Sequence, residues 1–353
     1  MNRKTPMQYL SLPNLQWAIK PGITPSTHDS DVVIDGWEPM TDFTRDNIES
    51  LLGHILGRTY DFPPNPLPVE RAHLLVRNED CLDFAVISWN VEIVNTVVRV
   101  VTKELPQPGA HLLWSKGAAA HIDGGLTPDW SAVESTDLHF TRPGWIAGDS
   151  KMFPEGFPKR SDGEADHRKA RACIEQVLNY ASRWNTRYAY LITPYELVVI
   201  RGKLDPTTQR QFTTRALGQP PLPVTPSAAS RQRLSNIYAP QRTPTSSIAG
   251  TSWTPPRQQQ RPPAVTPTSA RSSPSTAADS DRTYQQSPGG ERRARMMSAE
   301  VAVIPWHSDD SNGLSVNLAM LAIHVLAKIK NSLEEGYPPI HEDPAYRGAL
   351  GLD

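Results

Sequence analysis

The stretch that decides the fold is Gly144-Trp145-Ile146-Ala147-Gly148-Asp149-Ser150-Lys151, in which an apolar run ends on an Asp-x-Lys triplet. Such a run is typical of a short buried strand, and the side chains of a strand alternate between its two faces. Asp149 and Lys151 are therefore expected on one face and Ser150 on the other. The sequence thus predicts a carboxylate and an ammonium side by side where a buried strand ends.

A second acidic residue, Asp129, lies twenty residues before Asp149 in a Pro128-Asp129 turn. The positions from Trp130 to Val133 suit a strand, and pairing of the two strands would bring Asp129 beside Asp149. Two carboxylates offer hard oxygen ligands to Mg²⁺ or Mn²⁺ and leave coordination positions for a phosphate oxygen and a water. A neighbouring lysine can hold the attacking water and neutralise developing charge. Pro-Asp is also a common turn start and Asp-x-Lys triplets arise by chance, so the interpretation depends on the surrounding elements.

A helix and a hairpin are predicted after the triplet. Apolar residues recur at helical spacing from about Asp166 to Trp184, and this helix carries Gln176 and Tyr180 one turn apart. The runs from Arg187 to Thr193 and from Glu196 to Arg201 each suit a strand, and the Pro-Tyr turn between them predicts a hairpin.

A strand and a helix are also predicted near the C-terminus. Residues 299 to 306 suit the strand, and the Ser and Asp residues of 307 to 310 are expected to cap a helix that begins near Leu314. With these, the order of elements resembles the PD-(D/E)XK nuclease superfamily, most closely a group of fungal proteins with this domain. The resemblance covers about residues 70 to 204 and resumes at about 298 to 335. It implies an α/β fold with a restriction-endonuclease-like core, in which a central mixed sheet is flanked by helices.

The resemblance also implies roles for individual residues. It makes Asp129 and Asp149 metal ligands, Lys151 a catalytic residue, and Gln176 a supporting residue that reaches the site from one face of its helix. The expected cofactor is Mg²⁺ or Mn²⁺.

The third acidic ligand does not follow the family pattern. That pattern places an acid near a Trp-Asn pair on the first core helix, which here is expected from about Asp83 to Leu105, but the residues just before Trp89 are apolar. Glu92, one turn after Trp89, is the predicted substitute, with Asp83 or Glu79 as alternatives. A glutamate at this position equally suits the solvated face of an amphipathic helix, so its role stays open.

Composition divides the chain into four parts. Residues 205 to 298 are rich in Pro, Ser, Thr and Arg, lack apolar periodicity and hold twelve arginines against four acidic residues. Such a segment buries too little surface to offset its chain entropy, so a long disordered insertion is predicted. Residues 1 to 69 are expected to form an N-terminal extension with one helix, from Arg45 to Leu56. Residues 70 to 204 are expected to form the nuclease-like core, which residues 299 to 353 complete.

The cationic insertion has two interpretations. It can speed encounter with a polyanion such as DNA or RNA, or it can be a solubilising linker with Ser/Thr-Pro sites for phosphorylation. The linker interpretation is favoured, because the arginines are dispersed and few aromatic residues are present to stack on bases.

The functional expectation is an Mg²⁺-dependent nuclease that hydrolyses phosphodiester bonds in nucleic acid, DNA more than RNA. The alternative is a catalytically inactive nuclease-like module that binds nucleic acid or a protein partner. The only two cysteines, Cys81 and Cys173, argue against a disulfide scaffold or a zinc site. Neither a signal peptide nor a membrane span is evident, and the expected location is intracellular, nuclear or cytoplasmic.

Overall fold

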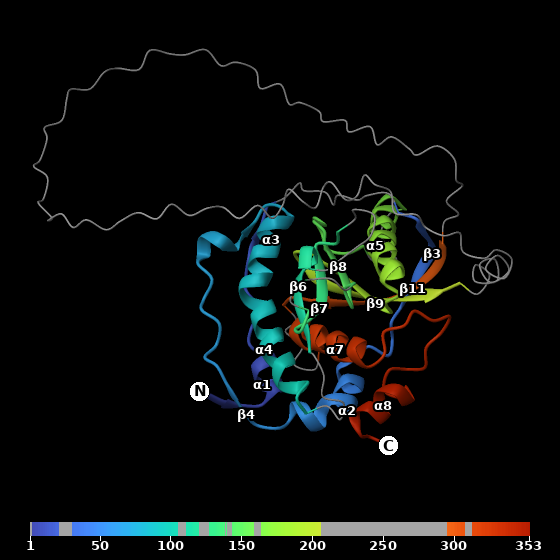
Figure 1. Ribbon diagram of the computed structural model, residues 1–353. Helices are drawn as coiled ribbons and strands as arrows, with labels where there is room; N and C mark the ends of the chain where they lie inside the picture. The colour runs from blue at the N-terminus through green and yellow to red at the C-terminus, as the bar shows by residue number, and fades with distance from the viewer. Residues whose placement is uncertain are drawn as a thin grey trace, which may run out of the picture. The chain divides into compact units, whose positions relative to one another are not determined.

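The computed structural model describes residues 2–20, 30–104, 111–119, 127–137, 139, 143–158, 164–205, 295–307 and 313–353. Its centre is a seven-stranded mixed sheet in the order β3-β11-β10-β9-β8-β7-β6 (Figure 1). The strands are β3 (Val32–Pro39), β6 (Leu112–Lys116), β7 (Trp130–Glu134), β8 (Ala147–Ser150), β9 (Tyr188–Ile192), β10 (Glu196–Leu204) and β11 (Arg295–Pro305). Neighbouring strands are antiparallel, except that β3 pairs parallel with β11 and β8 with β9.

Helices cover both faces of this sheet, so the predicted α/β class with a central mixed sheet flanked by helices is confirmed. One face packs against α5, and the other packs against α4 and α7 (Figure 1). The helices are α1 (Pro6–Leu10), α2 (Arg45–Leu56), α3 (Glu79–Val86), α4 (Glu92–Val101), α5 (Glu164–Trp184), α7 (Val316–Ile329) and α8 (Pro344–Leu350). Two small sheets pair β1 (Asn2–Lys4) with β4 (Tyr60–Phe62) and β2 (Ala18–Ile19) with β5 (Leu75–Val76). Short 3-10 turns span Arg71–Leu74 and Gly117–Ala119.

The strands on either side of the predicted insertion are neighbours. β9 and β10 form the predicted hairpin, and β10 pairs antiparallel with β11, with Ile200 opposite Val301. β11 begins at Arg295, inside the segment predicted as insertion. These first residues belong to the strand because alternate side chains such as Met297 and Ala299 are buried and because the strand also pairs with β3. The rest of the predicted disordered insertion, residues 206–294, lies outside the described residues.

The N-terminal region contributes directly to the main sheet. Its helix α2 has the predicted bounds, and the Thr44 hydroxyl accepts a hydrogen bond from the amide of Asn47 as its N-cap. Besides the single helix expected there, the region supplies α1 and the edge strand β3, which pairs with β11. Residues 1–69 therefore build part of the sheet as well as surrounding it.

A nearly continuous helix runs from α3 through a π-helical turn, Ile87–Val91, into α4. Within the described parts of the chain it is the one helical stretch, Glu79–Val101, that is long and apolar enough to cross a membrane by length and composition. Over half of its apolar window, 56%, is buried inside the protein, as in a core helix. The core helices of soluble proteins pass the same test, so this stretch by itself is weak evidence for a membrane span.

The helix cap predicted near the C-terminus was placed too early. Ser315 caps α7, because its hydroxyl accepts a hydrogen bond from the amide of Leu318. Residues 308 to 312, which include the Ser and Asp residues expected to cap it, lie outside the described residues. α7 is buried on nearly all sides from Val316 to Ala327, which agrees with its largely apolar sequence, although Asn317 and His324 are buried as well.

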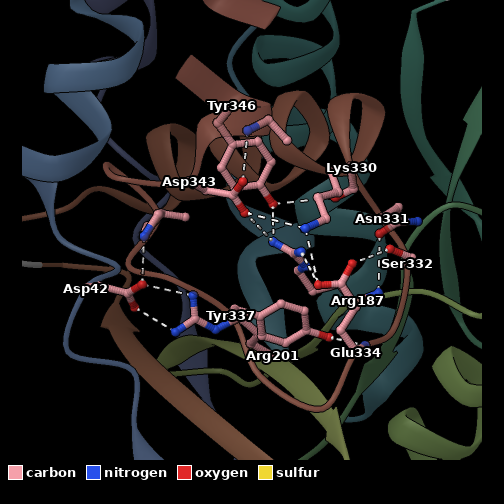
Figure 2. Close-up of polar contacts among 12 residues, drawn as sticks. Asp42, Arg187, Arg201, Lys330, Asn331, Ser332, Glu334, Tyr337, Asp343 and Tyr346 are labelled. Atoms are coloured by element: carbon pink, nitrogen blue, oxygen red, sulfur yellow. Dashed lines mark hydrogen bonds and ion pairs between the residues drawn. The ribbon is translucent and has the colours of Figure 1, made fainter. Parts of the chain in front are cut away.

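A buried polar cluster fastens the C-terminal segment to the start of β9 (Figure 2). The Arg187 guanidinium is fully buried; it donates to the Tyr346 hydroxyl over 2.7 Å and lies 3.9 Å from the Tyr337 ring centroid. Asp343 and Glu334 provide acidic partners for this arginine at 3.4 and 3.7 Å. Through its acidic partners and aromatic contacts, the buried cation holds the C-terminal segment against the start of β9.

Candidate functional site

The predicted pairing of the two site strands is present. β7 and β8 are antiparallel with Trp130 opposite Gly148, and the Ser150 amide donates to Asp129 Oδ2 over 3.0 Å. The carboxyl groups of Asp129 and Asp149 share a hydrogen bond. The geometry inferred from side-chain alternation and hairpin pairing therefore brings the two carboxylates together.

Gly117 holds the Pro-Asp turn against β6. Its amide donates to the Asp129 carbonyl over 2.7 Å, and a Cβ at this position would lie only 1.6 Å from the Pro128 carbonyl oxygen. A side chain here would therefore push the turn away from β6. This glycine positions Asp129, although no sequence motif singles it out.

Lys151 forms a buried ion pair with Asp149. The distance between Lys151 Nζ and Asp149 Oδ2 is 2.8 Å, and the two side chains are only 3% and 4% exposed. The Lys151 amide donates to the Ile192 carbonyl over 2.8 Å, which extends the alignment of β8 with β9. Burial alone would lower the pKa of Lys151, but the carboxylate of Asp149 outweighs it and raises that pKa.

The two carboxyl groups differ in their tendency to ionise. Burial and the adjacent Asp129 raise the pKa of Asp149 well above its ordinary value, although Lys151 opposes the shift. Burial also disfavours the charge on Asp129, but its hydrogen bonds from Asp149 and the Ser150 amide outweigh that effect and lower its pKa. Burial and the neighbouring carboxyl group thus act more strongly against ionisation of Asp149 than of Asp129, while Lys151 favours the charged form of both.

Asp83, and not Glu92, is the third acid near these groups. Asp83 accepts hydrogen bonds from the Ser150 hydroxyl and the Lys116 ammonium, and its charge acts on Asp129. Glu79, one turn earlier on α3, acts electrostatically on Lys151. The alternatives weighed for the third acid are thus on the site side of the helix.

Glu92 lies on another part of the helix surface. It is exposed and, after burial, is the main influence that raises the pKa of Tyr9 on α1. It follows Asp83 by nine residues, and the π-helical turn Ile87–Val91 lies between them. The structure therefore brings Asp83, one of the predicted alternatives, beside the carboxylate pair and places Glu92 next to Tyr9 instead.

Ser150 on β8 makes contacts at the site through both its side chain and its backbone. Its hydroxyl donates to Asp83 and accepts from Trp130 Nε1 over 2.8 Å, while its amide binds Asp129. Lys116 completes a closed ring of contacts, because its ammonium binds Asp83 and lies 4.5 Å from the Trp130 ring centroid. This ring fixes the strand that carries Asp149.

Gln176 lies on α5, one helical turn from Tyr180, whose pKa responds to the site's charges. It is 4% exposed, and its amide donates to the Tyr180 hydroxyl over 3.3 Å. Burial raises the pKa of Tyr180, which also responds to the charges of Asp149 and Lys151. On the same face, burial raises the pKa of Cys173 to about 12, so this thiol stays protonated near neutral pH.

No group of three His, Cys, Asp or Glu side chains that could hold a metal occurs among the residues the structure describes. The donor set at this site is the contacting pair Asp129 and Asp149, with Asp83 nearby but bound to Ser150 and Lys116. Such a pair fits Mg²⁺ or Mn²⁺, since Mg²⁺ commonly takes one or two carboxylates together with substrate phosphates and water.

The sequence did not indicate that Lys116, Ser150 and Tyr180 lie next to the predicted site residues. Only the spacing of Glu79 and Asp83, four residues apart on a helix, could have indicated which acids share a face. The comparisons with protein-family models, curated proteins and solved structures find no match to this chain. The function is therefore inferred from the chemistry of the site itself.

Proposed function

We propose that this chain is an Mg²⁺- or Mn²⁺-dependent nuclease of the PD-(D/E)XK superfamily with a restriction-endonuclease-like fold. The observation that carries the proposal is the buried Lys151–Asp149 ion pair in hydrogen-bond contact with Asp129. Gln176 on the helix that covers this face adds support. Nucleic acid, DNA more than RNA, is the proposed substrate inside the cell, in the nucleus or cytoplasm.

Each residue has a distinct role in this proposal. Asp129 and Asp149 would hold the cation, which when bound supplies Lewis-acid activation of a phosphate oxygen and a water. The Lys151 ammonium orients the attacking water in line with the scissile bond and neutralises charge on the phosphate. Gln176 and Tyr180 fix the α5 side of the site through their hydrogen bond.

The alternative is a catalytically inactive binding module on the same scaffold. It is favoured by the burial of Asp149 and Lys151, whose side chains are only 4% and 3% exposed. A module that binds nucleic acid or a protein partner has no need for accessible catalytic groups.

A cleavage assay separates these two functions. Wild-type protein is incubated with single- and double-stranded DNA and RNA in Mg²⁺, Mn²⁺ or EDTA, beside Lys151→Met and the exposed-lysine control Lys169→Met. The nuclease proposal predicts metal-dependent cleavage that falls by about 100-fold or more in Lys151→Met and persists in the control. Cleavage that is absent in every condition supports the binding module instead, and cleavage that is equal in both variants contradicts the role of Lys151 in the nuclease proposal.

A further inference from the structure

Lys116 is the most accessible charged group in the ring of contacts around Ser150. Its side chain is 42% exposed, whereas that of its partner Asp83 is 10% exposed. The Asp149 and Lys151 side chains lie deeper, at 4% and 3%. A ligand that approaches the carboxylate pair from this side therefore meets the Lys116 ammonium first.

The contacts of Lys116 leave it able to bind a ligand without leaving its place. An ammonium has three N–H donors. Among the described residues, Lys116 binds Asp83 and lies over the ring of Trp130, its cross-strand neighbour in β6 and β7. One donor remains for an oxygen at the exposed end, while the other contacts hold the side chain in a defined direction.

We propose that Lys116 contacts a backbone phosphate of the nucleic acid at the entrance to the Asp129–Asp149 site. The inference rests on the proposed function and names a substrate contact for it. A phosphodiester fits this position because it is anionic, and Lys116 also acts electrostatically on Asp129, which places the two groups near each other. A lysine that served only to neutralise Asp83 would have no need of its exposed position over Trp130.

The test measures how salt affects DNA binding. A short fluorescein-labelled DNA duplex is titrated with wild-type protein by fluorescence anisotropy in Ca²⁺ over a range of salt concentrations. Lys116→Gln keeps a donor for Asp83 but loses the charge, and Lys116→Arg keeps both. Lys169→Gln, on the surface of α5 and 51% exposed, is the control. Thermal melts confirm that each variant is folded.

One lost phosphate contact lowers the slope of log Kd against log salt by about 0.9 for a duplex. This loss is expected in Lys116→Gln and not in Lys116→Arg or the control. If folded Lys116→Gln gives the same slope as the wild type, the inference is overturned. That result leaves DNA binding, and with it the proposed function, in place. An equal loss in Lys169→Gln also overturns the inference, since any surface lysine then has the same effect. Wild-type protein that does not bind the duplex overturns this contact, whereas the proposed function is decided by the cleavage assay on single- and double-stranded DNA and RNA.

Discussion

At the scale of single residues, the site is governed by what two buried carboxyl groups do to each other. Asp129 and Asp149 share a hydrogen bond, and the pKa of Asp149 is raised by burial and by its neighbour. A divalent cation would offset the repulsion between the two carboxylates, which without a cation makes it costly for both to be ionised. The metal-free protein should therefore be least stable where Asp149 is forced to ionise.

This predicts a pH-dependent gain in stability from Asp149→Asn in EDTA. In the unfolded chain Asp149 ionises near its ordinary pKa of about 4. In the folded protein it keeps its proton to higher pH, so the stability it contributes is present at low pH and lost as pH rises. Asparagine does not titrate, so its advantage over wild type should grow from pH 4 to pH 8 in thermal melts. A constant or shrinking difference would contradict the raised pKa.

A second residue-scale prediction concerns Gly117. Alanine here would place a Cβ 1.6 Å from the Pro128 carbonyl oxygen, so the turn that carries Asp129 must move. The expected result is a loss of roughly 1–3 kcal/mol of stability together with weaker Mn²⁺ binding. Gly36→Ala is the control, because nothing lies within 4 Å of its added Cβ. Equal Mn²⁺ affinity in wild type and Gly117→Ala would show that this close contact does not position the site.

At the scale of elements, side-chain alternation along strands predicted which residues face the site better than helical spacing did. Alternation along the strand ending in Asp149 predicted which side chains share a face, because the strand period of two leaves no ambiguity. The face of the first core helix was assigned from Glu92 and Trp89, but the acids near the site, Asp83 and Glu79, lie before a π-helical turn, nine and thirteen residues ahead of Glu92. That turn cannot be inferred from composition, and neither can the contacts of Ser150 with residues distant in the sequence.

α7 carries a histidine that should control stability in acid. His324 is buried, its Nδ1 lies 2.7 Å from the Met320 carbonyl, and burial lowers its pKa to about 4. The unfolded chain takes up the proton near pH 6.5, so stability is full above that pH and falls between pH 6.5 and 4, by up to roughly 3 kcal/mol. His324→Leu should remove this part of the acid loss in urea titrations at a series of pH values. An unchanged pH profile would show that His324 is protonated at little cost.

At the scale of the whole molecule, strands from both ends of the chain build one sheet. β11 from the C-terminal region lies beside the β9–β10 hairpin, and β3 from the N-terminal region lies beside β11. The sequence predicted β10 and β11 as strands of one sheet from their apolar runs, and this is confirmed by their nine paired residues. It did not predict β3, because its exposed residues such as Asp35 and Glu38 belong to an edge strand with weak apolar alternation.

The pairing of β10 with β11 leads to a prediction for the insertion. Loop-closure cost changes only slowly with length, so replacing residues 215 to 292 by a short Gly/Ser linker should leave the melting temperature nearly unchanged. Differential scanning calorimetry of the two proteins measures this. A drop of many degrees would mean that the replaced segment contributes to the stability of the sheet.

We expect Asp129 and Asp149 to hold a divalent cation, and Lys151 to assist cleavage without binding that cation. Calorimetric titration of Mn²⁺ into wild type, Asp129→Asn and Lys151→Met tests it most directly, with the cleavage assay alongside. The account predicts saturable binding to wild type, binding at least about tenfold weaker in Asp129→Asn, and retained binding but lost cleavage in Lys151→Met. Wild-type protein that binds no Mn²⁺ at millimolar concentration and cleaves no substrate would contradict it.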